Sequence, residues 1–194
     1  PGFTEELPVD LECPSEAFQD LDTGRWYHEY TDYVIAKGLM NGMDETHFAP
    51  EGSLTRGMLL TTLYRLAGEA EPATFTDVKA GRYYAEAVAW AEDLGIAKGM
   101  TATAFQPEGT VTRQQAATFL YRYVTEYLEQ EAVEGADLTA FTDGSKVQDY
   151  AKTAMSWAVA EGFFEGYGDG TLRPFTALTR AQMAKLLTIL DLDF

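Results

Sequence analysis

The pattern with the clearest chemical content in this chain is a Thr-Arg dipeptide that occurs three times. Each copy stands just before a run of apolar residues at helical spacing, so each Thr is placed to cap the N-terminus of a helix. Gln115 and Gln182 follow two of these threonines by three residues, which is the spacing of a capping box, whereas Met58 leaves the first copy without one. The three dipeptides are Thr55-Arg56, Thr112-Arg113 and Thr179-Arg180.

Helix capping does not explain the three arginines. A cation in the first turn of a helix faces the positive end of the helix dipole, which costs about 0.3–1 kcal/mol. A bound anion would reverse the sign, because exposed backbone N–H groups, the dipole and the guanidinium would converge on it. An ion pair with a carboxylate of a neighbouring copy is the alternative, although pairing alone does not call for a first-turn position. Both interpretations stay open. If the arginines bind an anion, Arg113→Ala or Arg180→Ala should weaken binding and leave the fold intact.

The same register recurs in other residue types, which identifies an internal repeat. The Thr-Arg pairs are separated by 57 and then by 67 residues, and a proline and a glycine repeat with the same two spacings. A Phe-x-Asp motif recurs at spacings of 57 and 66 residues. The chain therefore contains three copies of one unit. Their markers are Pro50, Pro107 and Pro174; Gly42, Gly99 and Gly166; and Asp20, Asp77 and Asp143.

Each copy is predicted to contain a Phe-x-Asp turn, a first helix, a Gly-rich loop with the proline, and a second helix. Trp26 and Tyr150 are counted among the apolar positions of the first helices. One such helix pair cannot bury its apolar stripe alone, so the three pairs should share one core. We predict an all-α fold of three tandem helix-loop-helix repeats in one compact, approximately threefold domain. The repeats are expected at 18–68, 75–128 and 141–191, after an N-terminal extension at 1–17, with acidic connectors at 69–74 and 129–140.

Composition restricts the possible partners. The 14 Lys and Arg residues are outnumbered by 31 Asp and Glu residues, which gives a net charge of −17. Such a surface repels nucleic acid and anionic lipid, so neither is an expected partner. The sequence has no apolar run long enough for a membrane span and no visible signal peptide. Because it does not begin with Met, we expect it to be part of a longer protein.

The sequence offers no set of residues for catalysis, and we expect neither an enzyme nor a cofactor. Cys13 is the only cysteine, and neither His28 nor His47 has a matched acid, Ser or Cys at a useful spacing, so no metal site is expected either. Asp169-Gly170 lacks the other ligands of a calcium loop. Three aromatic residues share the repeat register and could stack on a sugar, although their mid-helix positions favour core packing. They are Tyr33, Trp90 and Trp157.

With these motifs, the chain resembles the S-layer homology domain family over residues 18–191. The third copy is the most similar, through Phe141-Thr142-Asp143, the loop from Gly166 to Pro174, and Leu178-Thr179-Arg180-Ala181-Gln182. The second copy matches through Phe75-Thr76-Asp77 and Thr112-Arg113-Gln114-Gln115, and the first is the weakest, with Phe18-Gln19-Asp20 and Thr55-Arg56-Gly57-Met58.

The resemblance implies a pseudo-trimer whose grooves between adjacent repeats bind an anionic, pyruvylated secondary cell-wall polysaccharide of bacteria. Arg56, Arg113 and Arg180 would contact the carboxylate, the cap threonines and Gln115 and Gln182 would shape the site, and Gly42, Gly99 and Gly166 would let the sugar approach the backbone. The protein would lie outside the cell, at its surface or in an S-layer, and would carry a cargo domain elsewhere in the full chain. Departures such as Met58 imply unequal binding by the copies. The alternative is a scaffold that binds protein through the same grooves.

Overall fold

A computed structural model describes residues 13–67 and 75–194, and in these ranges the regular structure is helical, with no β-strand. The predicted all-α fold is confirmed, with two α-helices per repeat. Most of the N-terminal extension and the connector predicted at 69–74 lie outside the described residues. The helices are α1 (His28–Ala36), α2 (Arg56–Ala67), α3 (Ala85–Asp93), α4 (Arg113–Arg122), α5 (Lys152–Ala160) and α6 (Arg180–Asp193).

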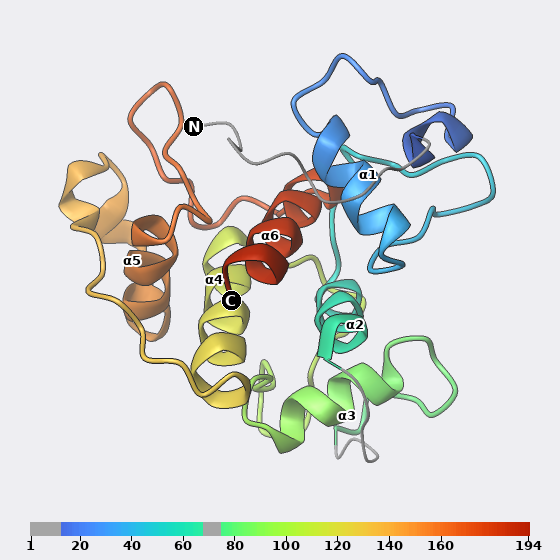
Figure 1. The fold of residues 1–194 in the computed structure, drawn as a ribbon. Coiled ribbons are helices and arrows are strands. Elements are labelled where there is room, and N and C mark those ends of the chain that lie inside the picture. The colour runs from blue at the N-terminus through green and yellow to red at the C-terminus, as the bar shows by residue number, and fades with distance from the viewer. Residues whose placement is uncertain (1–12, 68–74) are drawn as a thin grey trace.

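The helices form an inner and an outer ring. The second helices of the repeats, α2, α4 and α6, lie in the middle, and α1, α3 and α5 lie around them (Figure 1). The main partner of each outer helix is the inner helix of the preceding repeat, so α3 packs on α2, and α5 packs on α4. The first repeat completes the ring, because α1 packs on α6. Helix packing therefore joins different repeats, in cyclic order.

One core runs through all three repeats. Buried apolar side chains from all six α-helices form a single cluster, with Leu63, Leu120 and Leu187 contributed by the three inner helices. Tyr33, Trp90 and Trp157 are buried in this cluster, so their shared register reflects core packing. The boundaries proposed for the three repeats stay predictions.

The chain entering each inner helix is tied by its backbone to another repeat. The Arg56 amide donates to the Gly109 carbonyl at 2.9 Å, and the Gly57 amide donates to the Pro107 carbonyl at 2.8 Å. The second repeat makes the same two bonds to the third, and the third makes them to the first. The further pairs are Arg113 to Thr176, Gln114 to Pro174, Arg180 to Gly52 and Ala181 to Pro50.

The Phe-x-Asp aspartates hold the loops in which those prolines lie. The carboxylate of Asp77 accepts hydrogen bonds from the Phe105 and Gln106 amides, at 2.8 and 2.7 Å. Gln106 has a φ of +60°, a left-handed conformation that is unusual for a residue other than glycine. The first and third repeats have the same arrangement, with Asp20 holding Phe48 and Ala49, and Asp143 holding Leu172 and Arg173.

Candidate functional site

The three repeat arginines lie at the junctions between repeats. They are 4–6% exposed, and each donates two hydrogen bonds to backbone carbonyls of the next repeat in the ring. Arg56 Nε donates to the Phe105 carbonyl at 2.9 Å and Nη2 to the Lys98 carbonyl at 3.2 Å. The equivalent bonds run from Arg113 to Leu172 and Glu165, and from Arg180 to Phe48 and Asn41.

The structure shows partners for the arginines that the sequence did not suggest. The first two amides of each of α2, α4 and α6 donate to the neighbouring loop, and the third donates to the cap threonine, so these amides are not available to an anion. No ion pair in the described residues involves any of the three arginines, so the proposed pairing with a carboxylate is also absent there. The partners found in the structure are neutral carbonyls.

Each guanidinium is therefore buried, and no carboxylate of residues 13–67 and 75–194 forms an ion pair with it. It lies over an aromatic ring of the loop that it binds, with the Arg56 guanidinium carbon 4.4 Å from the centroid of the Phe105 ring. Burial lowers the pKa of Arg56 to about 10 and also lowers the pKa values of Arg113 and Arg180. Arginine side chains stay charged in proteins at neutral pH, and burial disfavours that charge here. An anion beside the guanidinium would relieve that penalty.

Each arginine lines a pocket, and each of these three pockets is built from all three repeats. The Arg56 pocket has a volume of about 350 Å³, and the Arg113 and Arg180 pockets have volumes of about 210 and 200 Å³. Each pocket takes its arginine from one repeat, its loop and inner helix from the next, and an aromatic residue from the remaining one. In the Arg56 pocket, these parts are Arg56; Lys98, Gly99, Met100, Gln115, Thr118, Phe119 and Arg122; and Gln148 and Tyr150.

The aromatic residues at these pockets are Trp26, Tyr83 and Tyr150, and they were not predicted as site residues. These residues are 53%, 52% and 51% exposed, whereas the sequence placed Trp26 and Tyr150 on apolar helix faces. Trp26 precedes α1, which begins at His28, so it lies outside the α-helix. A signal was present in the sequence, because these positions are also 57 and 67 residues apart.

The pockets are positively charged in a strongly acidic protein. The Arg56 pocket also contains Lys98 and Arg122, the Arg180 pocket contains Arg65, and the Arg113 pocket contains Lys185. With the repeat arginine included, the Arg56 pocket has three cationic residues, and the Arg180 and Arg113 pockets have two each. Together these are half of the 14 Lys and Arg residues of the chain. Glu165 is the one acidic residue that lines any of the three pockets, and it lies 3.6 Å from Lys185. The Arg56 pocket is therefore the most positive.

The other predicted site residues divide into those that line the pockets and those that do not. Gln115 and Gln182 line the Arg56 and Arg113 pockets, and Met58 holds the equivalent place in the Arg180 pocket. Thr55, Thr112 and Thr179 line none of these pockets and cap helices instead. The Met58 amide donates to the Thr55 hydroxyl at 3.1 Å, and both predicted capping boxes, at Thr112 and Thr179, are present.

Gly42, Gly99 and Gly166 line the three pockets, but their packing alone requires a glycine. A Cβ at Gly99 would lie 2.8 Å from both the Phe75 ring and the Ala104 carbonyl oxygen. At Gly42 and Gly166, a Cβ would likewise overlap the rings of Phe18 and Phe141. The repeated glycine therefore lets the Phe-x-Asp turn pack against the loop, whatever occupies the pocket.

Comparison with known proteins agrees with this architecture. The S-layer homology domain family matches residues 17–57, 74–117 and 140–184, one match for each repeat and together more than half of the chain. The chain therefore belongs to the S-layer homology domain family, as three tandem domains. Among the described residues, no helix has both the length and the apolar composition needed to cross a membrane.

Its relatives include surface-layer proteins, an anchoring protein and enzymes. The chain is 32% identical over 163 residues to the surface-layer 125 kDa protein of Lysinibacillus sphaericus, with 80% of this chain covered. It is 29% identical to a cellulosome-anchoring protein of Acetivibrio thermocellus, with 78% covered, and 26% identical to an amylopullulanase of Thermoanaerobacterium thermosulfurigenes, with 89% covered. It spans 13%, 34% and 9% of the lengths of these proteins, so the match is to a module that they share.

Proposed function

We propose that this chain is a non-catalytic anchoring module that binds an anionic secondary polysaccharide of the bacterial cell wall through the three arginine pockets. The observation that carries the proposal is the concentration of half of the chain's cations in these pockets, against a net charge of −17. Membership of the family, and relatives that form surface layers or anchor cellulosomes, support a place at the cell surface. The cargo would be another part of the full-length protein.

A sugar that bears a carboxylate, such as a pyruvyl ketal, suits the chemistry of the pockets. Nε and Nη2 of each arginine are engaged in holding the neighbouring loop, and neither bond uses Nη1, which has N–H groups to offer to a carboxylate. The buried positive charge makes this interaction stronger than it would be in water. The exposed aromatic ring provides a flat apolar face for the sugar ring.

Binding to purified cell-wall sacculi, before and after hydrofluoric acid removes the secondary polymer, tests the proposal. We expect sedimentation with intact sacculi and loss of binding after the treatment. Unchanged binding to treated sacculi would contradict the proposal and would favour the alternative, a scaffold that binds protein.

A charge reversal locates the interaction within the molecule. Lys98 is exposed and lines the Arg56 pocket. Arg56 donates to the backbone carbonyl of Lys98, so a substitution of the lysine side chain keeps this hydrogen bond. We expect Lys98→Glu to weaken polymer binding about tenfold or more, with an unchanged melting temperature. Lys79→Glu is the matched control, because Lys79 is an exposed lysine of the same repeat that lines none of the three pockets. Equal effects of the two variants would show that only net charge matters.

A further inference from the structure

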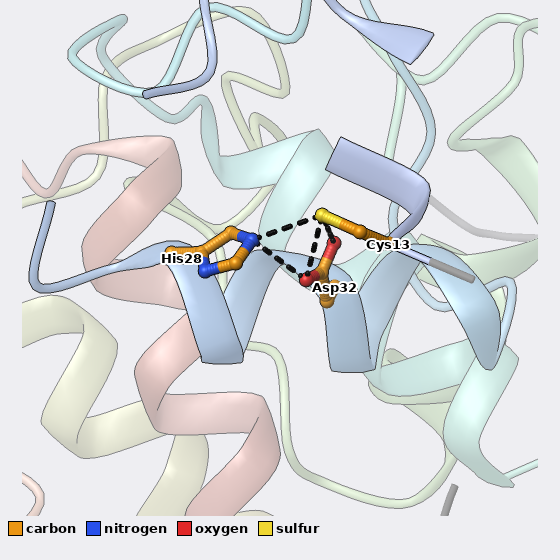
Figure 2. Close-up of side chains that lie close together, drawn as sticks. All are labelled: Cys13, His28 and Asp32. Carbon is orange, nitrogen blue, oxygen red and sulfur yellow. Dashed lines mark hydrogen bonds and ion pairs between the residues drawn. The ribbon is translucent and has the colours of Figure 1, made fainter. Parts of the chain in front are cut away.

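Three side chains of metal-binding type meet where the segment before the first repeat crosses α1. The Sγ atom of Cys13 lies 3.1 Å from Nε2 of His28 and 3.5 Å from Oδ2 of Asp32, and Nε2 lies 2.9 Å from the same Oδ2 (Figure 2). The sequence predicted no metal site because it has one cysteine and no recognised partner for either histidine. His28 and Asp32 are one helical turn apart in α1, and nothing in the sequence indicates that Cys13 lies beside them.

The three ligand atoms have nearly the spacing of a tetrahedral zinc site. Bonds of about 2.3 Å to sulfur and about 2.0–2.1 Å to nitrogen and oxygen place the ligand atoms roughly 3.4–3.6 Å apart. The observed separations, from 2.9 to 3.5 Å, are slightly shorter. Small side-chain movements would therefore admit an ion, without rearrangement of the backbone.

The local fold holds this arrangement. His28 is the first residue of α1, and Asp32 lies on the same face one turn later. The Ser15 amide donates to Oδ1 of Asp32 at 2.7 Å, which orients the carboxylate and leaves Oδ2 to face the imidazole. Ser15 is fully buried, so the short 3₁₀ helix that follows Cys13, Pro14–Ala17, is fixed against α1. The His28 and Asp32 side chains are 25% and 17% exposed, so the cluster is accessible to solvent.

The other repeats show that docking a segment on this helix face does not need such residues. In the repeat register, His28 and Asp32 correspond to Ala85 and Ala89 in the second repeat, and to Lys152 and Ser156 in the third. In the third repeat, the connector docks on the same face through a hydrogen bond from the Ser156 hydroxyl to the Ala136 carbonyl, at 2.5 Å. A serine therefore suffices where the only task is to hold the preceding segment. Only the first repeat has an imidazole and a carboxylate at these two positions, and the single cysteine of the chain lies beside them.

We propose that Cys13, His28 and Asp32 form a binding site for a borderline transition-metal ion, with Zn²⁺ as the best fit. A thiolate and an imidazole select Zn²⁺ over Ca²⁺ and Mg²⁺, which prefer oxygen ligands. Three protein ligands leave the fourth tetrahedral position to water. The ion would link the segment before the first repeat to α1 and so stabilise that junction.

Titration of the reduced protein with Zn²⁺ by calorimetry, and with Co²⁺ by absorption spectroscopy, tests the site. Excess Mg²⁺ is included to occupy the many surface carboxylates. We expect one ion per chain, a thiolate-to-cobalt charge-transfer band, and a melting temperature that rises with Zn²⁺. Cys13→Ser and His28→Gln should each weaken binding at least tenfold and remove the rise. His47→Ala is the matched control, because His47 lies 3.0 Å from Asp44 in an exposed pair without a thiol, and it should bind like the wild type.

A measurement without substitutions guards against variants that fold poorly. Zn²⁺ should slow the alkylation of Cys13 in the wild-type protein at least tenfold, and a chelator should restore the rate. Equal Zn²⁺ affinity in Cys13→Ser and the wild type, or an alkylation rate that Zn²⁺ does not change, would overturn the proposal. The cluster would then be only a hydrogen-bonded contact between the segment and α1.

Discussion

At the residue scale, the arginine of the Thr-Arg motif binds backbone carbonyls of the next repeat, and its position in the sequence indicates this only in part. A cation in the first turn of a helix needs a compensating partner, and the sequence suggested either an anion or a carboxylate. The partner found is a pair of carbonyls in the next repeat, 49 and 42 residues further along the chain for Arg56. Every residue has a carbonyl, so no residue type in the sequence identifies the acceptors. The cap threonines and glutamines were predictable because their partners are local.

These carbonyl bonds change the expected effect of removing an arginine. The sequence alone suggested that Arg113→Ala would leave the fold intact, whereas the structure predicts a loss of about 2 kcal/mol or more in the free energy of unfolding. The substitution removes two charge-assisted hydrogen bonds and leaves the Leu172 and Glu165 carbonyls without them. Arg113→Lys should also destabilise, because an ammonium cannot reproduce the fork. Urea denaturation measures both variants. Arg25→Ala, which breaks only an exposed 3.8 Å ion pair, should have little effect, and equal losses would contradict the prediction.

The exposed aromatic ring at each pocket supports a separate prediction. Tyr150→Ala should weaken polymer binding about fivefold, because stacking contributes about 1 kcal/mol, and the melting temperature should change little. Phe175→Ala is the control, since Phe175 is 52% exposed and lines none of the three pockets. Affinity for the extracted polymer, measured by calorimetry, separates the two. An equal loss in both variants would indicate a general surface effect.

At the scale of elements, sequence reasoning succeeded for helices and failed for their partners. The apolar spacing predicted two helices in each copy, and the described residues contain these six α-helices. Gly38, Gly95 and Gly162, which follow α1, α3 and α5, have a positive φ. The hydrogen bonds that each Phe-x-Asp carboxylate accepts from a loop beginning 28 or 29 residues later were not predicted. A repeat register shows that three positions are equivalent, but it contains no information about which segment each one contacts.

Those carboxylates predict a dependence of stability on pH. Burial alone would raise the pKa of Asp77, but its hydrogen bonds from the Phe105 and Gln106 amides outweigh this effect and place the pKa below its ordinary value. The pKa of Asp143 is lowered in the same way. A lowered folded-state pKa stabilises the protein above the unfolded value of about 3.9, and that stability is lost as the pH falls through the folded value. The free energy of unfolding should therefore decrease below about pH 5.

Two variants, Asp77→Asn and Glu45→Gln, distinguish the effect of these carboxylates on acid stability from that of the other acidic residues. Asp77→Asn should be less stable than the wild type at pH 7 and should lose less on acidification, because an amide oxygen does not titrate. Denaturant midpoints measured between pH 7 and pH 3 test this. Glu45→Gln, at an exposed acid of a loop, should follow the wild-type curve. An Asp77→Asn curve parallel to that of the wild type would assign the acid lability to other groups.

At the scale of the whole molecule, the sequence predicted one approximately threefold domain but did not show which helices pack together to close it. Three equivalent units could stack as an open array or close on themselves, and both give the same sequence register. Closure appears only in contacts between the first and last repeats, where α1 packs on α6 and the Leu54 amide donates to the Leu178 carbonyl. Pockets that combine all three repeats are a consequence of this closure. The pattern within one repeat therefore indicated the arginines as site residues but not the aromatic residues, which come from a different repeat.

Closure predicts that the ring fails as a unit when one repeat is removed. Deleting residues 141–194 removes α5 and α6, so α4 and α1 both lose their main helical partners, and Arg113 loses both of its carbonyl acceptors. In an open array, the remaining two repeats would keep their own interface and stay folded. Here we expect residues 1–140 to lose most helical circular dichroism signal, bind a hydrophobic dye and associate.

A nicked protein provides the matched control for this deletion. A protease site placed in the exposed connector between Glu131 and Glu134 leaves every helix and every pocket residue present. Because the two pieces are held by a closed ring of contacts, the cleaved protein should keep its circular dichroism spectrum and elute as one species until denaturant is added. Mixing the separate fragments should restore the fold. A monomeric, helical and cooperatively unfolding fragment 1–140 would show instead that the first two repeats form an independent unit and that ring closure is dispensable.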